Sequence, residues 1–171
     1  EEMVEDIQLI ESYDEEMIGS KMTTNFISIP YDISIKGAMR LLVKEAAEND
    51  NVYQIYVVRE NNEFFGTIEL RDLICARSDT KLESIIKTSY PTVHATNLIE
   101  DCINELKEYA LDSIPVLNVH NQLVGVITSF DIIETIDEEL SDDYAKLGGL
   151  TETEELGESL FISVKKHQFL R

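Results

Sequence analysis

The chain contains an internal repeat, and this feature constrains its fold more than any other. The segment "IYVVRENNEFFGTIELRDLI" (55–74) aligns without a gap to "IPVLNVHNQLVGVITSFDII" (114–133), at a constant offset of 59 residues. Each copy predicts a strand, a polar turn, a second strand and then a helix. Because a unit this small cannot bury its own apolar faces, we expect the two copies to pack sheet against sheet.

Identical residues occur along the whole length of the two copies. Seven aligned positions are the same: Ile55/Ile114, Val57/Val116, Asn62/Asn121, Gly66/Gly125, Ile68/Ile127, Asp72/Asp131 and Ile74/Ile133. The shared glycine fits a position where a side chain would obstruct the close approach of another backbone. Upstream, "FISIPYDISIKGAMRLL" (26–42) is similar to "YPTVHATNLIEDCINEL" (90–106), now at an offset of 64 residues. The sequence therefore predicts an α/β (α+β) fold of two pseudo-symmetric strand–helix–strand–strand–helix repeats, with flanking N- and C-terminal helices.

The charge of the chain limits what it can bind. Its 14 Lys and Arg against 34 Asp and Glu give a formal net charge of −20. Such a field repels phosphate backbones, so we expect no nucleic-acid partner, and cations or a basic partner are favoured. Cys75 and Cys102 match neither a disulfide framework nor a metal-ligand pattern, and we expect both to be small buried residues in a reducing compartment. The sequence shows no signal peptide and no membrane-length apolar run, which predicts a soluble fragment cut from a larger protein.

An acidic helix is predicted directly after the second copy. Seven carboxylates lie between Asp131 and Asp143, with no Lys or Arg among them. Like charges one turn apart destabilise a helix by about 0.2–0.5 kcal/mol per pair. Carboxylates without His or Cys suit partly hydrated Mg²⁺ and suit zinc poorly. The alternative interpretation is a solvated acidic face that binds nothing.

These motifs resemble a known family. The paired G-h-h-x-x-x-D segments (h apolar), Gly66–Asp72 and Gly125–Asp131, resemble a tandem of CBS domains, the regulatory Bateman module. The motifs "GSKMTT" (19–24), "LRDLI" (70–74) and "KLG" (146–148) are similar to the cytosolic part of the MgtE family of magnesium transporters and channels. In that family a connecting, or plug, helix follows the second CBS domain and leads to the pore.

The resemblance implies an organisation of the chain. It has five parts: an N-terminal helical segment (1–18) ending an N-terminal domain that is otherwise absent, CBS domain 1 (19–79), CBS domain 2 (80–134), the acidic connecting helix (129–150), and a linker with a membrane-proximal segment (151–171). The resemblance also implies a homodimer formed through the CBS helices, and a place at the cytoplasmic face of the cell membrane beside the chain's own transmembrane pore, which is likewise absent.

Carried over position by position, the resemblance implies a set of Mg²⁺ ligands. They are Glu100, Asp131, Glu134, Glu139 and Asp142. Mg²⁺ bound between carboxylates at the interface would compact the dimer and close the pore. The chain departs from the family pattern at Ala110 and Phe130, where an acidic residue is expected, so one or more ion sites would be missing or rearranged.

The alternative function is that of a CBS module of another transporter or enzyme that binds an adenine nucleotide such as ATP. The candidate residues are Arg71 and Asp72 in the first copy and Thr128 and Asp131 in the second. Each Asp has a structural alternative as a helix cap. Gln54 and Leu111 stand where the resemblance predicts aromatic residues that stack on the base, which argues for weak or absent ATP binding.

Catalysis is not predicted. The three histidines, His94, His120 and His167, lie in separate sequence contexts. No nucleophile elbow, P-loop, dinucleotide fingerprint or zinc-protease motif occurs in the sequence.

Overall fold

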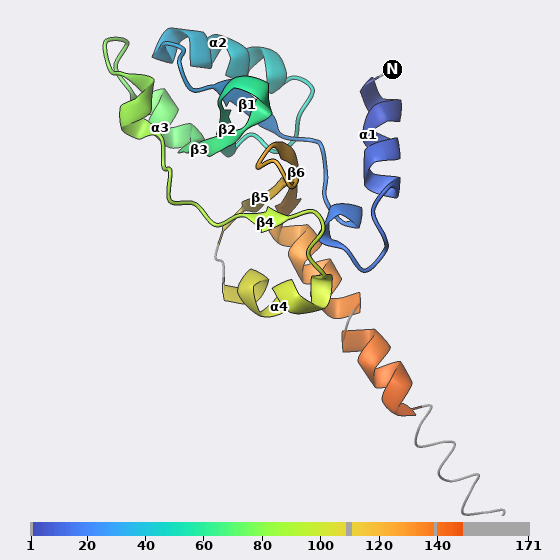
Figure 1. The fold of residues 1–171 in the computed structure, drawn as a ribbon. Coiled ribbons are helices and arrows are strands. Elements are labelled where there is room, and N and C mark those ends of the chain that lie inside the picture. The colour runs from blue at the N-terminus through green and yellow to red at the C-terminus, as the bar shows by residue number, and fades with distance from the viewer. Residues whose placement is uncertain (1, 109–110, 139, 149–171) are drawn as a thin grey trace, which may run out of the picture. The chain divides into compact units, whose positions relative to one another are not determined.

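The computed structural model of the chain describes residues 2–108, 111–138 and 140–148 (Figure 1). The contacts divide the chain into a first unit, Glu1–Ile133, and a second unit, Glu134–Arg171. The elements of the first unit are α1 (Glu2–Glu11), η1 (Ile18–Ser20), β1 (Ile27–Pro30), α2 (Ile35–Glu45), β2 (Gln54–Val58), η2 (Glu60–Asn62), β3 (Phe64–Glu69), α3 (Leu70–Cys75), η3 (Leu82–Ile85), β4 (Val93–His94), α4 (Ile99–Glu108), β5 (Ser113–Leu117) and β6 (Leu123–Thr128).

Each repeat forms its own three-stranded sheet. The strand orders are β1-β2-β3 and β4-β5-β6, with the first pair of each sheet parallel and the second pair antiparallel. The register is also repeated, because Val57 faces Gly66 in the first sheet and Val116 faces Gly125 in the second, and an irregularity in pairing follows each. The predicted fold of two pseudo-symmetric repeats is confirmed.

Helix α2 shows why these residues form the outer layers. Ser34 caps its N-terminus, where the hydroxyl oxygen accepts a hydrogen bond of 3.1 Å from the backbone N–H of Gly37. Ile35, Ala38 and Leu42, spaced three and four residues apart, form its buried face. They pack with residues of the first sheet in one apolar cluster. An amphipathic helix thus covers one face of the sheet, as the sequence predicts.

The two cysteines differ in burial. Cys102, in α4, is buried, but Cys75, at the end of α3, is exposed, so the prediction that both are buried is wrong for Cys75. Helix α3 has only six residues, of which Leu73 alone is buried. Because Cys75 follows Leu73 by two positions, it lies about 200° around the helix axis and on the side away from the core.

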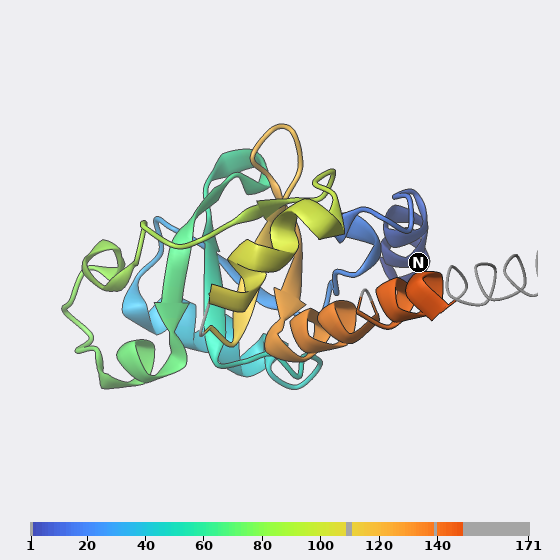
Figure 2. The same ribbon diagram turned by 90° about the horizontal axis from the view of Figure 1, so that it is seen from below.

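The two sheets face each other. Along β2, Ile55 and Val57 belong to the cluster shared with α2, whereas Tyr56 and Val58 pack against residues of the second sheet: Leu117, Leu123 and Val126. Figure 1 shows α2 and α3 beyond the first sheet and α4 beyond the second, and in Figure 2, seen from below, α4 lies in front of the strands. The first unit therefore has four layers, helices outside and sheets inside.

The segment that precedes each repeat pairs with the last strand of the other repeat. Thr23 forms an antiparallel bridge with Val126 on β6, and Lys87 forms one with Thr67 on β3. This exchange brings the segment before a repeat against each of the two equivalent glycines: the backbone of Lys87 at Gly66 and the side chain of Met22 at Gly125. A Cβ on Gly66 would lie 2.6 Å from the carbonyl oxygen of Lys87, and the prediction that this glycine permits close backbone approach is confirmed.

Helical residues continue after β6. Residues 129–138 and 140–148 are helical. Glu139, and the segment 151–171 predicted to be a linker and membrane-proximal region, lie outside the residues that the structure describes. Within the described ranges, no helix combines the length and the apolar character needed to cross a membrane.

Candidate functional site

A cleft of about 560 Å³ opens between the two repeats within the first unit. Its lining comes from both repeats: Tyr53, Gln54, Glu69, Leu70, Arg71 and Ile74 from the first, and Leu111 and Asp112 from the second. The cleft lies where β2 begins, β3 ends and α3 starts. Its volume is within the range of small-molecule sites, which run from about 300 to 1,000 Å³.

The walls of the cleft combine apolar side chains with one buried amide. Leu70, Ile74 and Leu111 supply aliphatic surface, and the ring of Tyr53 is 69% exposed. Gln54 is only 8% exposed, and its Nε2 has no hydrogen-bond partner among the residues that the structure describes. Buried polar groups in native proteins normally find a partner, so Gln54 contributes an unsatisfied donor among the residues that line the cleft.

A charged trio lies at one edge of the cleft. Lys87 Nζ donates a hydrogen bond to Glu69 Oε1, and Arg71 Nη2 lies 3.9 Å from Glu69 Oε2. The hydrogen bond from Lys87 lowers the pKa of Glu69, and the positive charges of Lys87 and Arg71 lower it further. Glu69 is therefore a carboxylate at neutral pH, and it already engages both cations near the cleft.

Two tyrosines are hydrogen bonded to Ser113, the residue that follows Asp112 of the cleft lining. The hydroxyl group of Tyr90 donates a hydrogen bond of 2.9 Å to the backbone carbonyl of Ser113, whose side chain is hydrogen bonded to the hydroxyl group of Tyr56. Burial raises the pKa of Tyr90 to about 12, and the charge of Asp112 adds to the effect. Burial also raises the pKa of Tyr56 well above its ordinary value. Both hydroxyls are neutral hydrogen-bonding groups at physiological pH.

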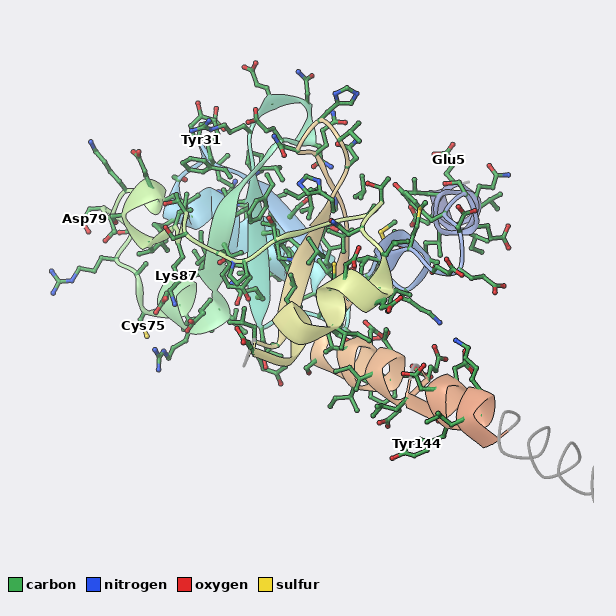
Figure 3. All side chains as sticks on the ribbon, turned by 60° about the horizontal axis from the view of Figure 1, so that its bottom comes forward. Glu5, Tyr31, Cys75, Asp79, Lys87 and Tyr144 are labelled. Carbon is green, nitrogen blue, oxygen red and sulfur yellow. The ribbon has the colours of Figure 1, made fainter. Side chains whose placement is uncertain are left out.

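The predicted nucleotide residues are divided between different places. Arg71 lines the cleft, but Asp72 lines a second pocket of about 380 Å³ that also includes Cys75 and Lys87. Figure 3 shows Cys75 and Lys87 on the same side of the first unit. Successive helical residues point about 100° apart, which explains why neighbours on α3 reach different pockets.

Thr128 and Asp131 bond to each other at the start of the helix that follows β6. Asp131 Oδ2 accepts hydrogen bonds from the backbone N–H of Thr128 at 2.8 Å and from its hydroxyl group at 2.7 Å. Thr128 Oγ1 in turn accepts from the backbone N–H of Asp131 at 3.2 Å. This is the reciprocal arrangement of a capping box, and it supports the structural alternative for Asp131. Neither residue lines the cleft.

The predicted metal ligands belong to both units of the chain. Glu100 lies exposed in the first turn of α4, and Glu134 and Asp142 are exposed in the second unit. Glu139 lies outside the described residues. In the ranges 2–108, 111–138 and 140–148, no three His, Cys, Asp or Glu side chains form a group that could hold a metal ion.

Sequence reasoning missed three residues that line the cleft. Tyr53 and Asp112 adjoin Gln54 and Leu111, which the sequence analysis singled out, and Glu69 lies two positions before Arg71. A signal was available, because Tyr53 and Asp112 occupy equivalent positions in the two copies, at the offset of 59. Extending the two aligned segments by two residues toward the N-terminus would have included both.

Comparison with known proteins gives the family. Two repeats of this topology, packed sheet to sheet beside a cleft, define a duplicated α/β module. The chain belongs to the CBS domain family, whose sequence model matches residues 15–79 and 82–138. It is 35% identical over 147 residues to the magnesium transporter MgtE of Enterococcus faecalis, an alignment that covers 86% of this chain and 32% of the relative. The chain thus spans about a third of the length of that curated relative.

Solved structures agree with the family. The soluble part of a magnesium transporter superposes with a TM-score of 0.73 at 34% identity, covering 78% of this chain and 52% of the other. The cytosolic domain of the Mg²⁺ channel MgtE, solved in complex with ATP, superposes with a TM-score of 0.71 at 25% identity, covering 76% of this chain and 52% of the other. The relatives named in these comparisons are transporters and channels, in line with a sequence that predicts no catalysis.

Proposed function

We propose that this chain is a regulatory part of a magnesium transporter, on the cytoplasmic face of the membrane, and that it senses Mg²⁺ through surface carboxylates. The observation that carries the proposal is the 35% identity to a magnesium transporter over 86% of the chain. The predicted ligand set, Glu100, Asp131, Glu134, Glu139 and Asp142, remains the working assignment.

The charge of the helix after β6 supports this function. Its described carboxylates are Asp131, Glu134, Asp137, Glu138, Asp142 and Asp143. All of them except half-buried Asp131 are exposed, and they belong to a chain with a formal charge of −20. Mg²⁺ keeps several of its waters and is held by one or two carboxylates at a time. Dispersed acidic residues therefore suit this ion without a cluster of three or more ligands within one chain.

Ion binding becomes a signal if it favours one arrangement of two copies. Carboxylates that face each other across a homodimer interface repel when Mg²⁺ is scarce, and bridging ions cancel the repulsion when it is abundant. A ligand shifts such an equilibrium only by its differential affinity for the two states, and ions bound only in the compact dimer provide it. In this proposal the connecting helices then close the pore.

The dimer contact in this proposal uses the first helix of each repeat. Val43 on α2 is 69% exposed and Leu98, directly before α4, is 42% exposed, so apolar surface is available on both. Sedimentation velocity over a Mg²⁺ titration tests the contact. A monomer at every Mg²⁺ concentration would exclude the coupling, even if ions bind.

The melting temperature and small-angle scattering test the sensing itself. A ligand at about 100 times its Kd adds about 2.7 kcal/mol, which for a chain of this size raises the melting temperature by about 5–10 °C. MgCl₂ is expected to produce this shift and to reduce the radius of gyration, whereas NaCl at matched ionic strength is not. Equal responses to the two salts would contradict the proposal.

A matched pair of variants separates specific binding from total charge. Glu134→Gln with Asp142→Asn removes two of the predicted ligands and is expected to blunt both responses. Asp79→Asn with Glu83→Gln removes the same charge from exposed residues of the connection between α3 and β4 and is expected to leave them intact. If both double variants behave alike, the helix carboxylates hold no specific ion.

A second candidate function is binding of an adenine nucleotide in the cleft. It is favoured by the volume of the cleft, by Arg71 in its lining and by the unpartnered amide of Gln54. The similar cytosolic domain solved with ATP supports it by analogy. Calorimetry with ATP, in the presence and in the absence of Mg²⁺, tests this candidate, and the absence of heat in both conditions would exclude it.

A further inference from the structure

We infer that the cleft selects nucleosides with at most one phosphate over polyphosphates, and that Glu69 sets this selection by holding Arg71 and Lys87. The inference rests on the second candidate function, nucleotide binding in the cleft. It concerns the charge of the ligand, which the resemblance to a domain solved with ATP does not predict.

The charges around the cleft disfavour ligands that carry several negative charges. Glu69 and Asp112 are the acidic residues of the lining, and among the side chains that the structure describes Arg71 is its only cation. Lys87 lines the second pocket and reaches this region only through its hydrogen bond to Glu69. The lining is therefore negative overall, and it repels a triphosphate far more strongly than a neutral nucleoside or a monophosphate.

A phosphate in the cleft also competes with Glu69 for the hydrogen-bond donors of Arg71 and Lys87. A phosphate that enters the cleft has to bind Arg71, and Glu69 already lies 3.9 Å from that guanidinium. Because Glu69 is part of the chain, it competes at a high effective concentration. Arg71 has five N–H donors, so it can meet one phosphate and keep its contact with Glu69. A triphosphate needs a second cation, and Lys87 lines the second pocket, where the carboxylate of Glu69 already offsets its charge.

The other side chains of the lining favour a nucleoside over a simple anion. Gln54 is more than nine-tenths buried and its Nε2 has no partner among the described residues, so a turn of this side chain would offer a donor to a ring nitrogen or carbonyl oxygen of a base. Leu70, Ile74 and Leu111 provide the apolar walls that a flat ring requires. The carboxylate of Asp112 can accept hydrogen bonds from ribose hydroxyls. The lining thus offers partners to a base and to a sugar, whereas it offers a chain of phosphates only Arg71 among the described residues.

Calorimetry with adenosine, AMP, ADP and ATP tests the inference, because these probes share base and sugar and differ in charge. The titrations are run in EDTA, so that no divalent ion masks the phosphates. The unmodified chain is expected to bind AMP at least tenfold more tightly than ATP. Glu69→Gln frees Arg71 and Lys87, and it is expected to strengthen ATP binding tenfold or more with little change for adenosine.

Glu63→Gln is the matched control. It removes one exposed carboxylate just before β3, about 20 Å along the strand from Glu69, and it is expected to leave the ATP-to-AMP ratio unchanged. Far-ultraviolet circular dichroism and a thermal melt confirm that each variant is folded.

Each result of the titrations decides a different claim. Tighter binding of ATP than of AMP by the unmodified chain, or equal effects of Glu69→Gln and Glu63→Gln, would overturn the selection alone. If none of the four probes binds to any folded variant, nucleotide binding and the selection are both wrong.

Discussion

The hydroxyl groups of Tyr56 in the first repeat and Ser113 in the second are hydrogen bonded to each other inside the interface between the two sheets. Tyr56 is fully buried and Ser113 is 3% exposed. The bond joins β2 to β5, the central strands of the two sheets. It is a polar link beside the aliphatic and aromatic side chains that pack between the two sheets.

Removal of either hydroxyl is expected to destabilise the fold. Tyr56→Phe or Ser113→Ala leaves one buried hydroxyl without its partner, which costs about 1–3 kcal/mol. The double variant removes both groups and is expected to cost less than the sum of the two single changes. Urea unfolding measures the three free energies. Additive costs would show that the two hydroxyls do not depend on each other.

The two equivalent glycines are expected to differ in their tolerance of a methyl group. In Gly66→Ala the new Cβ would lie 2.6 Å from the backbone carbonyl oxygen of Lys87, so the backbone has to shift, at a cost of about 1–3 kcal/mol. In Gly125→Ala the nearest atom is the flexible Sδ of Met22, at 2.5 Å. We therefore expect Gly66→Ala to be the more destabilising change.

A second background tests the physical cause of that difference. Met22→Ala shortens the side chain that approaches Gly125, and in this background Gly125→Ala is expected to cost less in urea unfolding. Gly66→Ala is expected to cost the same with or without Met22. If Met22→Ala reduces the cost of both glycine variants equally, the contacts of Gly66 with Lys87 and of Gly125 with Met22 do not cause the difference between them.

Asp131 is both a predicted metal ligand and a helix cap, and the two roles respond differently to substitution. Asp131→Asn keeps an acceptor for the N–H and hydroxyl groups of Thr128 but loses the charge, so it is expected to retain most of the stability. Asp131→Ala removes the cap and is expected to cost about 1 kcal/mol. If Asp131 also binds Mg²⁺, Asp131→Asn blunts the rise in melting temperature that Mg²⁺ produces.

The repeat in the sequence was sufficient to predict the fold. The aligned copies indicated two equivalent strand–helix–strand–strand–helix units, and the shared glycine indicated a close backbone approach, which the structure shows at Gly66. The exchange of Thr23 and Lys87 between the repeats could not be predicted, because a single bridging residue leaves no periodic pattern. The exposure of Cys75 was also missed, since a helix of six residues has too few turns to define its buried face.

The candidate site was only partly predictable, for a related reason. Gln54, Arg71 and Leu111 were singled out and do meet in one cleft. Glu69 and Asp112 belong to different repeats, and only the packing of the two sheets brings them to the same cavity. The resemblance placed four of the five predicted metal ligands on the acidic helix, but a position along a helix does not indicate what lies opposite it.

Alkaline pH is expected to weaken the fold through Tyr56 and Tyr90. Burial raises the pKa of Tyr90 to about 12, whereas an exposed tyrosine titrates near 10. Below about pH 10 the folded and unfolded chains both keep these protons, so the stabilising effect of the neutral hydroxyls is fully present. As the pH rises further, the unfolded chain ionises first and is favoured, so stability falls as the pH passes through the folded pKa.

Thermal melts across this range, with tyrosinate absorbance recorded in parallel, measure the effect. Tyr90→Phe is expected to remove part of the alkaline loss and part of the late absorbance change, whereas Tyr144→Phe, at a residue that is 75% exposed, is expected to leave both intact. Identical alkaline profiles for the two variants would show that the ionisation of Tyr90 is not linked to folding.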